Sequence, residues 1–105
     1  MDRATEKGRS MHIDHIGLSV GDLDAQLAWY QKAFGFESAN PFAVEALGLR
    51  GAFLLGPDSV AVELLERHGS THRPPSASAP DELLSQGWGH LCFRVDDIGS
   101  VFERL

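Results

Sequence analysis

The chain has 105 residues, a formal net charge of −6 and 43% hydrophobic residues, which is the balance of a small globular domain. The acidic balance argues against a nucleic-acid-binding face, which needs clustered Lys and Arg, and no apolar run approaches the roughly 20 residues of a membrane span. The single cysteine, Cys92, excludes an internal disulfide. We therefore expect a cytoplasmic protein with neither nucleic acid nor membrane as a partner.

The first third of the chain predicts an arm, a strand and a helix. Residues 1–10 are polar and lack the apolar stretch of a signal peptide, so we expect a disordered N-terminal arm. From Ile13 to Val20 apolar residues alternate, which is typical of a strand and places His15 on the face opposite the apolar side chains. Asp22 is a suitable N-cap and Gly35 a suitable C-cap for a helix over 23–34.

The middle of the chain predicts a hairpin followed by a connector. The segments 51–55 and 59–66 flank the turn at 56–58 and indicate two antiparallel strands. In the second of them, Val62 and Leu64 alternate with Glu63, which then lies on the opposite face from the helix. Residues 67–88 are rich in Ser, Pro and His and indicate a connector, with one short helical turn capped at Ser78.

The end of the chain repeats its beginning. Residues 15–23 align without gaps on residues 90–98, at a constant offset of 75. The repeat predicts a strand from His90 to Val95 and a helix after Asp97, whose buried side consists of Ile98, Val101, Phe102 and Leu105. Completing the second copy requires roughly 35 to 45 further residues. Either the chain is a fragment of a longer protein or the missing strands come from elsewhere.

Strand parity brings three polar residues to one face of the predicted sheet. His15, Glu63 and His90 all lie opposite the helix-facing side chains, and imidazole and carboxylate are the ligand types that hold Zn, Ni, Co, Mn or Fe. The alternative is a solvated strand face, and on residue types and parity alone the two interpretations are evenly matched. Cys92 lies on the same face, and we expect it to be a buried inert thiol.

Two segments resemble a known family. His12 to Val20, with Asp22–Leu23 and Trp29–Tyr30, is similar to the start of vicinal-oxygen-chelate proteins, and so is Gly89 to Ile98. This superfamily includes glyoxalase I, methylmalonyl-CoA epimerase, extradiol dioxygenases and the bleomycin- and fosfomycin-resistance proteins. The resemblance implies an α+β fold, with a βαβββ glyoxalase-like module at 11–66, the connector at 67–88 and an incomplete second module at 89–105. The mixed sheet is expected to curve around a cleft.

The same resemblance implies a site and an activity. It assigns His15, Glu63 and His90 as metal ligands and Glu63 also as a catalytic base; a fourth ligand, a Glu, would lie near position 138 by the 75-residue offset. The implied function is a divalent-metal-dependent lyase or isomerase, of the glyoxalase I or epimerase type, acting on a small substrate with vicinal oxygens. A metal-free antibiotic-binding protein and an Fe(II) extradiol dioxygenase are the alternatives. The family also implies a homodimer.

Overall fold

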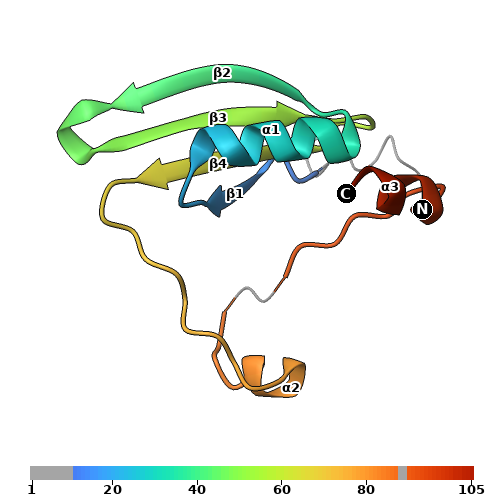
Figure 1. The fold of residues 1–105 in the computed structure, drawn as a ribbon. Helices are drawn as coiled ribbons and strands as arrows, with labels where there is room; N and C mark the ends of the chain where they lie inside the picture. The colour runs from blue at the N-terminus through green and yellow to red at the C-terminus, as the bar shows by residue number, and fades with distance from the viewer. Residues whose placement is uncertain (1–10, 88–89) are drawn as a thin grey trace.

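The computed structural model describes residues 11–87 and 90–105 of the chain. The elements follow the order β1 (Ile16–Ser19), α1 (Leu23–Phe34), β2 (Glu37–Val44), the short 3-10 helix η2 (Glu45–Leu47), β3 (Leu49–Leu55), β4 (Ala61–Arg67), α2 (Ala79–Glu82) and α3 (Ile98–Arg104). Figure 1 shows α1 lying across one face of a four-stranded sheet, while the chain after β4 runs away from the sheet to α2 and returns to α3. The α+β class and the βαβββ order predicted for the first module are confirmed.

The sheet is mixed and open, with strand order β1-β4-β3-β2. β1 pairs parallel to β4, whereas β4 with β3 and β3 with β2 pair antiparallel. A parallel pair needs a long crossover, which α1, β2 and β3 provide. The predicted hairpin is therefore confirmed as β3 and β4, and its turn is closed by the Gly56 N–H, which donates to the Val60 carbonyl at 2.8 Å.

Helix α1 begins and ends at the predicted residues because its signals are local. The Asp22 carboxylate accepts the Ala25 N–H at 3.1 Å, which satisfies one of the free donors of the first turn. Gly35 adopts the left-handed conformation with φ of 70°, and its N–H donates to the Gln31 carbonyl at 2.9 Å. The apolar stripe of the helix then packs on the sheet.

The core lies between α1 and the sheet. Its buried members come from α1, from the central strands β3 and β4, and from the residues that directly follow β1 and precede β2; they are Val20, Leu23, Phe36, Leu54, Val62 and Leu64. Leu54 and Leu64 are 0% exposed. Because α1 covers only this face, the other face of the sheet is left for the candidate site.

Strand β2 was implied by the family resemblance and not by residue alternation. Asn40 has a left-handed φ of 51°, and the pairing with β3 shifts between Ala39 and Phe42. This β-bulge adds one residue to β2, so that Ala39 and Phe42, three positions apart, pair with Phe53 and Gly51 and share a face. An inserted residue breaks the period of two, which explains why the pattern did not predict the strand.

In the second half of the chain, only the predicted helices are confirmed. Ser78 caps α2 and Asp97 caps α3, both as predicted. Residues 90–95 form no strand, so that prediction was wrong for this chain. A strand needs a hydrogen-bonded neighbour, and in the described ranges each of the four strands pairs only with others of the first module. The predicted arm at 1–10 and the boundary at 88–89 lie outside the described residues.

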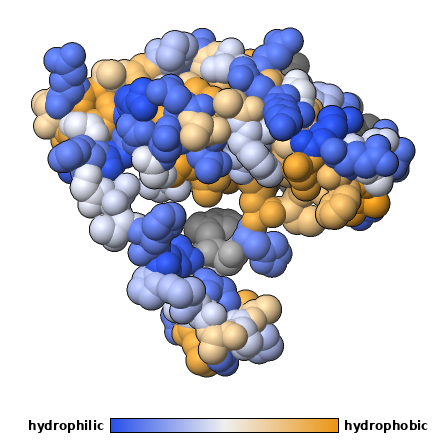
Figure 2. Space-filling view, viewed as in Figure 1, coloured by the Kyte–Doolittle hydropathy of each residue, from blue (hydrophilic) through white to orange (hydrophobic). Residues whose placement is uncertain are grey.

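The predicted buried side of α3 is largely exposed. Ile98 and Phe102 are 78% and 76% exposed, and Leu105 is 58% exposed. Figure 2 shows hydrophobic surface over this end of the molecule. The prediction assumed a second sheet against the helix; in the part of the chain that the structure describes, α3 instead contacts the end of α1, where Arg104 Nε donates to the Ala33 carbonyl at 3.1 Å. No helix of these ranges is long and apolar enough to cross a membrane.

Candidate functional site

The face of the sheet opposite α1 carries the candidate site. In the register, Gly17 of β1 pairs with Glu63 of β4, and Glu63 pairs with Phe53 of β3. Paired residues point to the same side of a sheet, so these three form one row across its open face. Val62 and Leu64, on either side of Glu63, are buried under α1. The parity predicted for Glu63 is therefore confirmed.

His15 lies immediately before β1 and faces Glu63. Its Nε2 atom is 3.9 Å from Glu63 Oε1, and its Nδ1 atom is 2.7 Å from Asp14 Oδ2. The His15 ring also meets the Phe53 ring edge to face, with centroids 5.1 Å apart and an interplanar angle of 79°. Two chain segments that are 48 positions apart in sequence are thus brought together, as strand parity predicted.

The two facing groups differ in their access to water. The side chain of Glu63 is 20% exposed and that of His15 is 38% exposed, whereas that of Asp14 is 86% exposed. The hydrogen bond from His15 holds the pKa of Asp14 below its usual value. Asp14 is therefore a carboxylate that accepts the Nδ1–H of His15, which leaves Nε2 as the atom directed at Glu63.

Two of the three ligands predicted within this chain, His15 and Glu63, lie close to the spacing that a divalent ion requires. Two ligands in adjacent positions around one ion, each at about 2.1 Å, are about 3 Å apart, so His15 and Glu63 need a movement of about 1 Å. His90 is exposed, and within residues 11–87 and 90–105 no group of three His, Cys, Asp or Glu side chains is close enough to hold a metal. The three-residue ligand set stays a prediction, of which the structure brings two members together.

The segment that contains His90 lies against the first module without joining its sheet. Phe93 packs between Phe34 and Phe36, with centroid distances of 5.6 and 5.7 Å. Leu91, Cys92 and Phe93 line an apolar groove of about 220 Å³ together with the starts of β1 and β4. Cys92 is exposed, so the expectation of a buried thiol was wrong. Residues 90–92 are therefore held by the packing of the Phe93 ring and not by a β-ladder.

Sequence reasoning missed the two residues that contact His15. Asp14 immediately precedes His15, and a carboxylate next to a predicted metal-binding histidine was a signal that could have been used. Phe53 had no such signal, because its contact depends on the register between β3 and β4.

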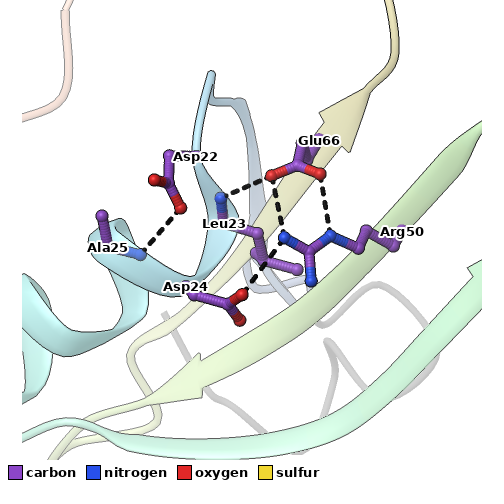
Figure 3. Close-up of polar contacts among 6 residues, drawn as sticks. All are labelled: Asp22, Leu23, Asp24, Ala25, Arg50 and Glu66. Carbon is purple, nitrogen blue, oxygen red and sulfur yellow. Dashed lines mark hydrogen bonds and ion pairs between the residues drawn. The ribbon is translucent and has the colours of Figure 1, made fainter.

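A second polar cluster lies on the α1 side and is structural. Figure 3 shows the Arg50 guanidinium against Glu66, with Nε donating to Oε1 at 2.7 Å and Nη2 donating to Oε2 at 3.1 Å. Glu66 also accepts the Leu23 N–H at 2.8 Å, and Arg50 Nη2 reaches Asp24 at 3.3 Å. These contacts lower the pKa of Glu66 to about 2, chiefly through the Arg50 hydrogen bonds, and raise that of Arg50. The cluster fixes the first turn of α1 to the sheet.

Comparisons with known proteins agree with the fold. Residues 12–105 match the model of the glyoxalase/bleomycin resistance protein/dioxygenase superfamily. The chain is 29% identical over 93 residues to the ethylmalonyl-CoA/methylmalonyl-CoA epimerase of Cereibacter sphaeroides, a match that covers 89% of this chain and 67% of the relative.

Two solved structures share the fold. A glyoxylase/bleomycin resistance protein/dioxygenase domain from Frankia superposes with a TM-score of 0.67 at 22% identity, over 90% of this chain and 69% of that one. The trypanothione-dependent glyoxalase I of Leishmania major gives a TM-score of 0.67 at 24% identity, over 90% of this chain and 63% of that one. At these identities the likeness concerns the fold alone, and the chain spans about two thirds of the length of these proteins.

Proposed function

The chain belongs to the glyoxalase/bleomycin resistance protein/dioxygenase superfamily, and from this membership we propose that it serves a divalent-metal-dependent lyase or isomerase reaction. The substrate class is a small molecule with vicinal oxygens. The observation that carries the proposal is the approach of His15 Nε2 to the Glu63 carboxylate, at 3.9 Å on the open face of the sheet. Imidazole and carboxylate are the donors that such ions take, and relatives that include an epimerase support the reaction class.

In this proposal His15, Glu63 and His90 are the ligands that the chain supplies, and the ion is Ni, Zn, Co, Mn or Fe. A divalent ion bound there supplies Lewis-acid stabilisation of the negative charge that develops on a substrate oxygen. Glu63 would accept the proton from the carbon adjacent to the carbonyl group that carries this oxygen, and the electron pair of the broken C–H bond would pass to the oxygen. Its side chain is 20% exposed, so burial limits the contact of Glu63 with bulk water.

A metal-free binding protein is the second candidate, and one observation favours it. In the described part of the chain, the third ligand does not join His15 and Glu63. The open face instead offers Phe53 and Phe42, rings that can hold an apolar ligand. In that case the three polar residues are replaceable by Ala without loss of ligand binding.

Metal content of the purified chain tests the first candidate. Elemental analysis of the wild type is compared with His15→Ala, Glu63→Ala and His90→Ala, and with Glu45→Ala, which removes an exposed carboxylate in η2. We expect close to one equivalent of metal in the wild type and in Glu45→Ala, and a loss in the three ligand variants. A wild type free of all five metals after expression in metal-supplemented medium contradicts the proposal.

The reaction class requires its own assay. Solvent deuterium exchange into methylmalonyl-CoA reports proton abstraction next to a thioester carbonyl, and turnover of a methylglyoxal hemithioacetal reports the glyoxalase reaction. We expect Glu63→Gln to abolish whichever reaction the wild type performs, because the amide cannot accept the proton. Oxygen consumption with Fe(II) would instead identify a dioxygenase.

We further propose that the protein is a homodimer in the cytoplasm. β1 and β2 are the edge strands of the open sheet, and unpaired edges favour association. Light scattering at micromolar concentration that gives only the monomer mass contradicts the dimer.

A further inference from the structure

We propose that Asp14 and Phe53 are the positioning residues of His15, a role that rests on the proposed metal function. Asp14 fixes the tautomer of the imidazole by accepting the proton of Nδ1, and Phe53 fixes the plane of its ring. Together they direct Nε2 at Glu63. Neither residue touches the reacting atoms; both act through His15.

The position of His15 makes such support necessary. The paired part of β1 begins at Ile16, which pairs with Val62, so His15 precedes the ladder. Its backbone is therefore held less firmly than that of a residue inside the strand. The side-chain contacts of His15 decide where the imidazole points.

The Asp14 contact determines which ring nitrogen of His15 is available to bind a metal ion. The distance of 2.7 Å between Asp14 Oδ2 and His15 Nδ1 is that of a charge-assisted hydrogen bond. A proton held on Nδ1 leaves the lone pair on Nε2, the atom that is 3.9 Å from Glu63 Oε1. A carboxylate behind a histidine ligand orients the ring and raises its basicity in known metal sites.

The Phe53 contact determines the orientation of the ring. The two rings meet edge to face at 5.1 Å, the favoured arrangement for an aromatic pair. Phe53 pairs directly with Glu63 across β3 and β4, so the ring that holds His15 is placed by the same register as the carboxylate that His15 faces. A quarter turn of the imidazole about its Cβ–Cγ bond would break both contacts, whereas a half turn would break only the contact with Asp14.

Nuclear magnetic resonance of the metal-free chain tests the role of Asp14 in fixing the tautomer of His15. Nitrogen shifts of His15, measured at about pH 9 where a free imidazole is neutral, report the tautomer. We expect the Nδ1–H form in the wild type, its loss in Asp14→Ala and its partial retention in Asp14→Asn, which keeps an acceptor oxygen. Glu45→Gln is the control for the lost charge. An unchanged tautomer in Asp14→Ala overturns the role of Asp14.

The ring contact is tested by a pair of identical substitutions on one face of the sheet. Phe53→Leu removes the aromatic edge beside His15, while Phe42→Leu removes the ring that lies over Gly51. We expect the His15 ring protons to shift in Phe53→Leu and to stay in place in Phe42→Leu. Equal shifts in both variants, or none in Phe53→Leu, overturn the role of Phe53.

Metal affinity then separates this inference from the proposed function. We expect Asp14→Ala and Phe53→Leu to weaken metal binding roughly 10- to 100-fold, with Asp14→Asn intermediate and Glu45→Gln at the wild-type value. A wild type that binds no metal but shows the tautomer effect contradicts the proposed function and supports the positioning of His15. A wild type that binds metal no more tightly than Asp14→Ala and Phe53→Leu overturns the positioning role.

Discussion

Leu64 and Leu65 offer a direct test of which face of the sheet is the core. They are consecutive in β4 and therefore point to opposite faces. Leu64 is 0% exposed beneath α1, while Leu65 is half-buried on the open face, in the row that pairs it with Ser19 and Gly51. Replacing each by Ala removes the same atoms from the two sides of one strand.

The expected costs differ because burial differs. A fully buried Leu→Ala substitution destabilises a protein by about 3 to 5 kcal/mol, from the lost transfer energy and the cavity left behind. For half-buried Leu65 we expect about 1 kcal/mol, since three carbon groups at about 0.8 kcal/mol each are only partly removed from water. A small domain has a total stability of about 5 to 15 kcal/mol, so the cost of Leu64→Ala is a large fraction of it. Leu64→Val, at about 1 kcal/mol, is the milder companion.

Urea unfolding followed by circular dichroism measures these costs. With a slope of about 1.2 kcal/mol per molar urea, the midpoint should fall by about 3 M for Leu64→Ala and by less than 1 M for Leu65→Ala. Equal losses at the two positions would refute the reasoning. Repeating the titration at tenfold lower protein concentration then shows whether the folded chain associates with a second copy, because only an intermolecular contact makes the midpoint depend on concentration.

Two further predictions concern the sheet and its link to α1. The folded-state pKa of Glu66, about 2 against a usual 4.5, makes this carboxylate stabilising above about pH 5, and the contribution is lost as the pH falls toward 2. Glu66→Gln should therefore lower the urea midpoint at pH 7, and its midpoint should approach that of the wild type at pH 2; a difference in midpoint that stays constant with pH contradicts this. Gly51→Ala should destabilise by about 1 to 3 kcal/mol, because its Cβ would lie 2.6 Å from Phe42 Cζ and 2.7 Å from the Leu64 carbonyl oxygen; a midpoint unchanged from wild type shows that the strands can separate without cost.

The sequence predicts those parts of the fold whose causes are local. The bounds of α1 follow from the Asp22 cap, the Gly35 left-handed turn and the apolar stripe between them, and α3 follows from its Asp97 cap. Strand β2 does not follow, because the bulge at Asn40 breaks the alternation and the pairing that defines the strand is with β3, across a turn. Its existence came from the family resemblance alone.

The same distinction applies to the candidate site, where residues placed by a single strand were predicted and contacts between strands were not. His15 and Glu63 follow from alternation within single strands, once each is assigned its helix-facing side. The contact of Phe53 with His15 requires the register of three strands, which a single sequence does not contain. Parity failed for His90 because the argument holds only for a residue in a paired strand, and residues 90–95 are not in one.

The position of His90 and the exposed side of α3 have one physical cause. In the first copy of the repeat, β1 is a strand because β4 pairs with it from Val62 to Leu65, and the same strand carries Leu64 under α1. Residues 91–94 are the equivalents of β1 at the 75-residue offset. A strand paired with residues 91–94 would bury Ile98 and Phe102 in the same step. Ordering of the third ligand and completion of the second core are therefore coupled.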